Sequence, residues 1–136
     1  MKLALAFGVC AVLLTACAQT SVQPLTQDSF KIATQAAPAC GPQGARDIAF
    51  KAAAIEVIKR GGDRFIVVGD QTGSRITGGQ YWGYGGYQTY NSNLQDMVIQ
   101  MVAPSSPDYK RALSARQTLG SDWKAVVAEG TPNTCT

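Results

Sequence analysis

Hydrophobic and polar positions along the chain predict three strands. Residues 28–34 (DSFKIAT) alternate, with Phe30 and Ile32 on one side, which is the period of a half-buried strand. Residues 65–68 (FIVV) form a continuous apolar run bounded by charges and glycine, as expected of a strand that is covered on both faces. Alternation resumes in residues 93–103 (NLQDMVIQMVA), which predicts a third strand.

Two other segments have helical patterns. Residues 45–62 are rich in alanine and other strong helix formers. Two cations lie in the last turn, and Gly61 stands where a helix commonly ends. Residues 105–120 have Ser106 in the N-cap position before a proline and end at a glycine, so we expect a second helix there. Residues 121–130 predict either a short C-terminal helix or a further strand.

The order strand, helix, strand, strand, helix predicts an α/β (α+β) domain with a small mixed sheet of about three strands. A strand, a helix and a strand within roughly 40 residues make a parallel βαβ unit with a right-handed crossover the default. The strand at 93–103 would then return antiparallel to the run at 65–68. We expect residues 28–136 to form one compact domain. Residues 17–27 are polar and lack periodicity, which predicts a tether.

The N-terminus has the pattern of an export signal. One cation at Lys2 precedes an apolar stretch over residues 3–14, and two small residues follow it. The stretch is shorter than the roughly 20 residues that a membrane-spanning helix needs. We therefore expect residues 1–16 to be a signal peptide that is removed.

The end of this leader resembles the lipobox of bacterial lipoproteins, with Leu14, Thr15, Ala16 and Cys17 in the places of an aliphatic residue, two small residues and the invariant cysteine. The resemblance implies that Cys17 becomes the lipidated first residue of the mature chain and attaches it to a membrane. Several acyl chains would hold it durably, since each buried methylene contributes about 0.8 kcal/mol. Ala18 after the cysteine, rather than aspartate, favours the outer membrane. The alternative is an ordinary cleaved signal, cut after Ala16 or Ala18.

The four cysteines differ in what their positions predict. Cys10 leaves with the leader and Cys17 takes lipid, so that Cys40 and Cys135 remain in the exported domain. A pair of cysteines in an oxidising compartment predicts a disulfide. A metal site is the alternative, but the pair lacks partner ligands because the chain has no histidine.

Composition argues against several classes of function. Once Lys2 leaves, 11 basic and 9 acidic side chains remain, a net charge of +2 that is too small to indicate nucleic acid. The absence of histidine excludes Ser–His and Cys–His nucleophile pairs and removes the commonest metal ligand. The carboxylates are scattered, and GYGGYQ lacks the third glycine of a dinucleotide-binding loop. We expect no enzyme activity, no metal and no cofactor.

Residues 71–93 hold the one pattern with recognition chemistry. Glycines alternate there with aromatic residues and no charge follows Arg75, which predicts a long loop or an extended, irregular hairpin tip. Aromatic side chains of this kind can stack on sugar rings or pack against a protein partner. They can equally fold back over the sheet edge of their own domain. The candidate binding residues are Tyr81, Trp82, Tyr84, Tyr87 and Tyr90.

The whole pattern resembles a family of small envelope lipoproteins from alphaproteobacteria. In that family an alanine-rich helix leads into a G-x-D-x-F-x-V-V strand, matched here by Gly61, Asp63, Phe65, Val67 and Val68. The resemblance covers most of the mature chain and implies a compact α/β lipoprotein domain in the envelope, but it brings no activity with it.

The sequence thus predicts a non-enzymatic lipoprotein of the outer membrane whose domain faces the periplasm as a structural or interaction module. Its expected partners are the membrane, through the lipid, and an envelope protein or a glycan. The alternative is a lipoprotein that binds glycan or protein through the aromatic residues.

Overall fold

The computed structural model describes the backbone of residues 17–82 and 86–135, and the side chains of these residues outside 74–91. The expected signal peptide, residues 1–16, lies outside the described residues. The elements are β1 (Ala18–Pro24), β2 (Ser29–Ala36), a 3-10 helix η1 (Pro38–Cys40), α1 (Gly41–Lys59), β3 (Arg64–Trp82), β4 (Gly86–Met101), β5 (Leu113–Ser114), α2 (Ala115–Leu119) and α3 (Trp123–Glu129).

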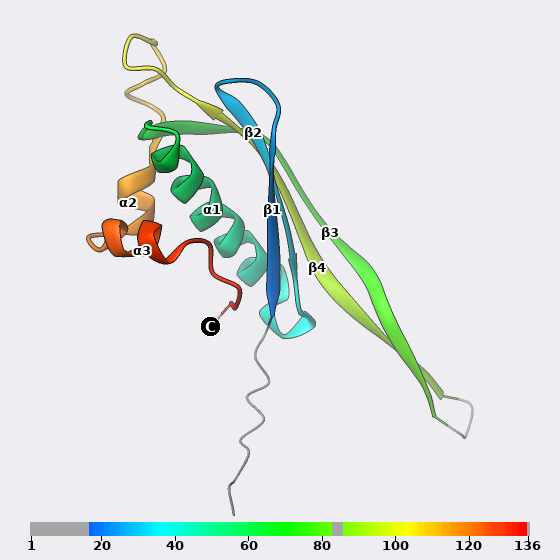
Figure 1. The fold of residues 1–136 in the computed structure, drawn as a ribbon. Coiled ribbons are helices and arrows are strands. Elements are labelled where there is room, and N and C mark those ends of the chain that lie inside the picture. The colour runs from blue at the N-terminus through cyan, green and yellow to red at the C-terminus, as the bar shows by residue number, and fades with distance from the viewer. Residues whose placement is uncertain (1–16, 83–85, 136) are drawn as a thin grey trace, which may run out of the picture.

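The fold is a mixed α+β structure with a five-stranded antiparallel sheet in the order β1-β2-β4-β3-β5. α1 lies against one face of the sheet, α2 and α3 lie beside α1, and the β3–β4 hairpin continues well beyond the rest of the domain (Figure 1). The sheet has more strands than the sequence predicted, and the mixed α+β class is as expected.

The predicted parallel βαβ pairing is not formed. β2 and β3 do run in the same direction, but β4 lies between them and pairs antiparallel with both. The antiparallel return of β4 along β3 is as predicted, with Val67 opposite Ile99. β4 also aligns Met97 with Ile32 of β2, so the apolar positions of the two strands share one face.

The core is the layer between α1 and the sheet. The helix contributes mainly alanines and the strands contribute the larger side chains. Because alanine ends at Cβ, the helix backbone can lie close to the sheet without leaving voids. The buried members are Phe30, Ile32, Ala49, Ala52, Ala53, Ala54, Val57, Phe65, Met97, Ile99 and Ala115.

The tether predicted for residues 17–27 is wrong over most of its length. Residues 18–24 form β1, which pairs with β2 from Ala18 opposite Ala36 to Pro24 opposite Phe30. β1 is an edge strand that buries little of its own surface, so its sequence lacks the alternation that usually indicates a strand.

The run at 65–68 is covered on one face only. Phe65 is fully buried, whereas Val68 is 58 % exposed. The register shifts between Val67 and Gly69, so that Val68 is the extra residue of a bulge and has no opposite partner on β4. The continuous apolar run therefore does not indicate a second covering layer.

The second helix is shorter than predicted. α2 begins at Ala115 and not after Ser106, whose hydroxyl accepts a backbone hydrogen bond within a turn. Asp63 explains the late start, because its carboxylate accepts a hydrogen bond from the Ser114 hydroxyl at 3.1 Å and its carbonyl accepts one from the Ala115 amide at 2.7 Å. These contacts hold β5 against β3, so the helix begins only after them. Residues 123–129 form the short C-terminal helix α3, one of the two predicted alternatives.

Candidate functional site: the Cys17 end and the hairpin arm

One end of the sheet carries both Cys17 and a projecting hairpin. Ala18 of β1 pairs with Ala36 of β2, Ala36 pairs with Asn93 of β4, and Asn93 pairs with Ser74 of β3. This row is the last that spans four strands. Beyond it β3 and β4 continue as a two-stranded ribbon of residues 75–82 and 86–92, which we call the arm (Figure 1).

The arm is long for an unsupported hairpin. Eight residues of β3 at about 3.3 Å each give it a length of about 26 Å. Its ladder runs from Arg75 opposite Ser92 to Trp82 opposite Gly86, with one register shift between Ile76 and Gly78. A two-stranded hairpin alone is only marginally stable in water. Within the described residues no third strand pairs with the arm.

The candidate aromatic residues lie on this arm and do not form a folded-back loop. In the ladder Tyr81 is the register partner of Tyr87, Trp82 is next along β3, and Tyr90 is opposite Gly78. Tyr84 lies outside the described residues, and so do the side chains of the other four. The backbone shows an extended hairpin, one of the two forms that the sequence allowed.

A buried polar network fixes the base of the arm. Gln95 is fully buried, and its Oε1 accepts a hydrogen bond from Thr72 Oγ1 at 2.8 Å. Its Nε2 donates to the Asp70 carboxylate and, at 3.2 Å, to the carbonyl of Gln71. Arg46 of α1 pairs with Asp70 at 2.5 Å. Because these bonds link α1, β3 and β4, they hold the hairpin in register before it leaves the domain.

The sequence contained a signal for this network that the hydrophobic pattern concealed. Gln95 is in phase with Met97 and Ile99, which face the core. A polar residue at a core-facing position is buried only where hydrogen-bond partners meet it. The partners of Gln95 come from β3, and Arg46 of α1 pairs with one of them, so they could not be identified without the fold.

The backbone of Cys17 is held within the domain. Cys17 forms an antiparallel bridge with Thr134, and its carbonyl accepts a hydrogen bond from the Ala37 amide at 2.9 Å. The next amide, Ala18, donates to the Asn133 carbonyl at 2.7 Å. Cys17 is exposed. A group attached to its sulfur would thus be joined to the folded domain without an intervening spacer.

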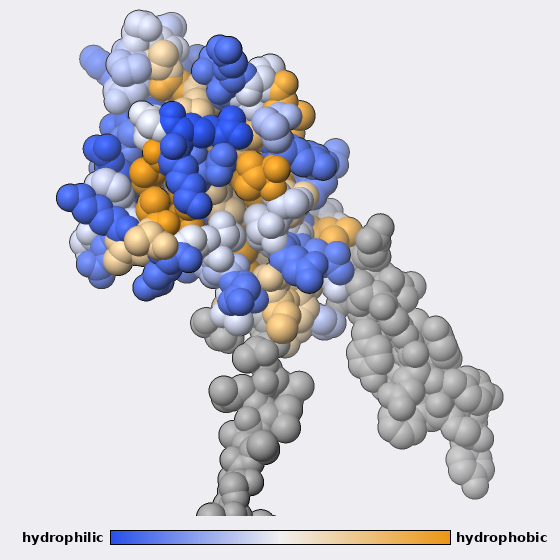
Figure 2. All heavy atoms as spheres, viewed as in Figure 1, coloured by the Kyte–Doolittle hydropathy of each residue, from blue (hydrophilic) through white to orange (hydrophobic). Residues whose placement is uncertain are grey.

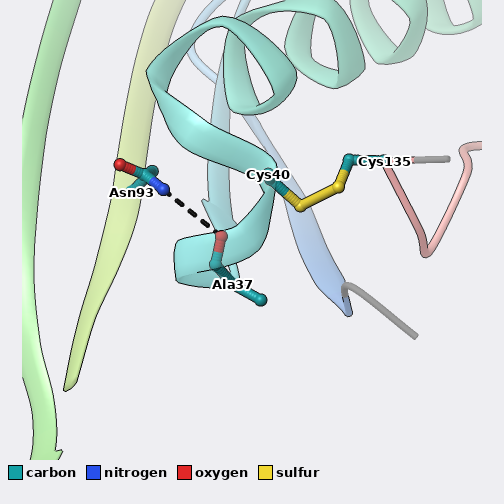
Figure 3. The surroundings of a disulfide bond; sticks show 4 residues. All are labelled: Ala37, Cys40, Asn93 and Cys135. Carbon is teal, nitrogen blue, oxygen red and sulfur yellow. Dashed lines mark hydrogen bonds between the residues drawn. A yellow bond between two sulfur atoms is a disulfide. The ribbon is translucent and has the colours of Figure 1, made fainter. Parts of the chain in front are cut away.

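Cys40 and Cys135 lie in contact as a disulfide, with a distance of 5.7 Å between their Cα atoms (Figure 3). They pack against a small apolar cluster of Ala18, Ala36, Ala45 and Ile48, which joins β1, β2 and the start of α1. Beside them Asn93 donates its Nδ2 to the carbonyl of Ala37 at 3.3 Å, so β4 is fastened to η1 at the same end (Figure 3). The disulfide therefore holds the C-terminal tail against the end of the sheet that carries Cys17.

The sheet face opposite α1 is a second surface, which the sequence pattern did not indicate. Lys31 and Asp96 form an ion pair at 2.8 Å across β2 and β4 on this face. Shallow hollows flank the pair, one between Gln19, Gln35 and Leu94 and another between Gly69 and Val98. Both hollows are open and mixed in polarity, so neither encloses a small ligand.

Three of the described carboxylates have partners within the domain. Asp70, Asp96 and Asp63 are each engaged by a cation or a hydroxyl of the domain. Within residues 17–73 and 92–135 no three His, Cys, Asp or Glu side chains come together as metal ligands. In the same part of the chain no helix combines the length and hydrophobicity required to cross a membrane.

Comparison of the chain with family models, with curated proteins and with solved structures found no match. The register at the Cys17 end and the geometry of the arm are therefore the observations from which a function can be argued.

Proposed function

We propose that the protein is a non-enzymatic lipoprotein of the bacterial envelope, anchored in the outer membrane by lipid on Cys17, with its domain in the periplasm as an interaction module. The arm is its binding element. One observation carries this proposal: β3 and β4 leave the sheet as a paired ribbon at the end where Cys17 lies.

The lipid part of the proposal is supported by the sequence before Cys17 and by the position of that residue. Leu14, Thr15 and Ala16 match the lipobox, and Cys17 is exposed at the edge of the domain. A lipidated cysteine must be accessible to the enzymes that process it, and a buried thiol would not be.

The binding part is supported by the physical cost of the arm. A ribbon with two uncovered edges is marginally stable and prone to pair with other chains. The domain nevertheless reinforces its base with the Gln95 network and the bond from Asn93 to Ala37. A glycan or an envelope protein is a candidate partner for the aromatic residues of the arm, which are Tyr81, Trp82, Tyr87 and Tyr90.

The anchor is tested by metabolic labelling with a clickable fatty acid. The full-length protein should incorporate label, and Cys17→Ala should lose it while retaining the domain. Cys10→Ala is the matched control, because that cysteine lies in the predicted leader, and it should label normally. Continued labelling of Cys17→Ala would contradict the lipobox assignment.

The arm is tested separately by photo-crosslinking in cells. A photoreactive amino acid at position 87 should yield crosslinked products that are absent when it stands at position 124, on α3 of the same domain. Equal products from the two positions, or none from either, would contradict a binding role for the arm.

A further inference from the structure

Charged residues are distributed unevenly between the two ends of the sheet. Four stretches of the chain contain no Asp, Glu, Lys or Arg, and each contributes residues to the Cys17 end: residues 18–27, 32–45, 76–95 and 130–136. They supply the start of β1, the end of β2 with η1 and the first residues of α1, the arm with its base, and the C-terminal tail. Segments far apart in the sequence thus combine into one uncharged end.

The opposite end of the sheet differs. Residues 97–107 also lack charge, but Asp28, Asp63 and Arg64 lie beside them there. The amide of Met101 donates to the carbonyl of Asp28, and the amide of Val102 donates to that of Arg64. The opposite end of the sheet therefore carries charged residues although one of its segments is uncharged. The four uncharged segments named above meet at the end that holds Cys17.

Most of the charges that border the uncharged stretches have partners: Lys31 pairs with Asp96 at 2.8 Å, and Gln43 donates a hydrogen bond to the Asp47 carboxylate at 2.9 Å. Arg46 of α1 is paired with Asp70. Arg75 stands at the base of the arm, opposite Ser92 in the ladder, and beyond it the arm is uncharged in sequence to its outer end. A single basic position at such a base is suited to anionic phosphate groups, which attract basic residues at a membrane surface.

An uncharged segment of the sequence that is rich in aromatic residues and lies next to a lipid anchor is suited to a membrane surface. Bringing charged groups towards a bilayer costs desolvation energy, whereas tyrosine and tryptophan are favoured at the level of the headgroups. Tyr81, Trp82, Tyr87 and Tyr90 stand at register positions on the arm, beyond the row that contains Ala18.

We infer that the partner of the arm is the lipid surface itself, and that the Cys17 end and the arm lie together in the headgroup layer of the membrane that holds the anchor. This inference rests on the proposed lipid anchor and names the binding partner within the proposed function. A glycan is less well matched, because the arm projects from the anchored end of the domain and not from the end that would face the periplasm.

The fixed backbone at Cys17 strengthens the inference. Its bridge to Thr134 and the bond from Ala37 leave no flexible spacer between lipid and domain. Acyl chains on Cys17 would therefore bring the sheet end to the bilayer surface. The arm, about 26 Å long, starts at that end and provides a second contact. Two contacts determine the orientation of the domain, which one lipid attachment point would leave free to rotate.

The chain contains two tryptophans, which makes a direct test simple. Lipidated mature protein is reconstituted in vesicles of phosphatidylethanolamine and phosphatidylglycerol, with or without bromine on the acyl chains as a quencher. Trp123→Phe leaves Trp82 on the arm as the one fluorophore, and Trp82→Phe leaves Trp123 of α3 as the matched control. Flotation of the vesicles first shows whether the protein is anchored.

Emission from Trp82 should move to shorter wavelength in vesicles and be quenched by the brominated lipids, while emission from Trp123 should be unchanged. Thr89→Asp adds a carboxylate to the arm and should reduce the quenching of Trp82. Thr26→Asp adds the same group in the turn after β1, at the far end of the sheet, and should not reduce it.

The outcomes separate the two proposals. A protein that floats with the vesicles while Trp82 remains unquenched overturns this inference and leaves the anchor intact. A protein that does not float overturns the anchor and this inference with it. Emission from Trp82 that responds to soluble peptidoglycan fragments and not to lipid overturns the inference in favour of a glycan partner.

Discussion

Loss of the Cys40–Cys135 disulfide should destabilise the domain by about 4–5 kcal/mol. The two cysteines are 95 residues apart in sequence. In the chain-entropy model, closing a loop of that size removes about 16 cal/mol/K from the unfolded state, which is about 4.7 kcal/mol at 25 °C. In the folded state Asn133 and Thr134 retain their backbone bonds to Ala18 and Cys17, so the tail does not lose all of its contacts.

The measurement is urea unfolding of the mature chain carrying Cys17→Ser, which prevents lipidation. Cys40→Ser, Cys135→Ser and the double variant are compared with that parent. Because either single substitution removes the same bond, the double variant should lose about as much stability as each single variant, and the two losses should not add. Hydrogen exchange at the Ala18 amide should also become faster in all three variants, since its partner Asn133 then lies in a tail that is no longer tied covalently to Cys40 and opens more often.

Two results would refute a shared bond between the cysteines. One is a parent protein in which a thiol reagent modifies both Cys40 and Cys135 without prior unfolding or reduction. The other is a double variant whose loss equals the sum of the single losses, which would show that each cysteine contributes through its own packing and not through a shared bond. A loss below about 1 kcal/mol would show that the constraint on the unfolded state is far weaker than the loop length implies.

Two further substitutions test how the fold is held, each with a matched control measured by the same denaturant titration. Asp63→Ala should lower the free energy of unfolding by about 2–3 kcal/mol, because it removes the acceptor for the Ser114 hydroxyl. Asp108→Ala, in an exposed ion pair, should lower it by less than about 0.5 kcal/mol. Equal losses of stability would show that Asp63 does not hold β5 in place. Gly61→Ala should lower the free energy of unfolding by about 1–2 kcal/mol, because Gly61 has a φ of 84°. Gly73→Ala, where the added Cβ has open space around it, should change stability by less than about 0.5 kcal/mol. If Gly61→Ala left stability unchanged, the left-handed backbone conformation after α1 would be contradicted.

The segments with strong local patterns could be predicted from sequence. The alanine-rich helix and the alternating strand at Phe30 have the expected type, because the side chains that define them pack on the core next to them. The contact between Cys40 and Cys135 was also expected. The predicted compartment is oxidising, and these are the two cysteines left in the predicted mature domain once Cys10 and Cys17 are assigned, so the pairing did not require knowledge of the fold.

The segments that were missed owe their structure to distant partners. Residues 18–24 are a strand because β2 offers them an edge, and their own composition is that of a linker. The predicted helix after Ser106 is cut short because Asp63, far earlier in the chain, captures Ser114. In both places a tertiary contact overrides the local preference, and such a contact has no signature in the segment itself.

The arm could not be predicted from the sequence for a different reason. Glycine and tyrosine in residues 76–90 were compatible with an irregular loop, and only the register shows that the ribbon leaves the sheet at the Cys17 end. The convergence of the uncharged stretches was equally hidden, because their separation in the sequence gives no indication that they meet.

The contact of Cys17 and Ala18 with residues 133–134 also constrains the order in which the domain can assemble. β1 pairs along its length with β2, but the amide of Ala18 takes its partner from Asn133, far later in the chain. During synthesis this end of β1 therefore stays incomplete until residues 133–134 have joined the fold, and a chain shortened at about position 130 would never complete it.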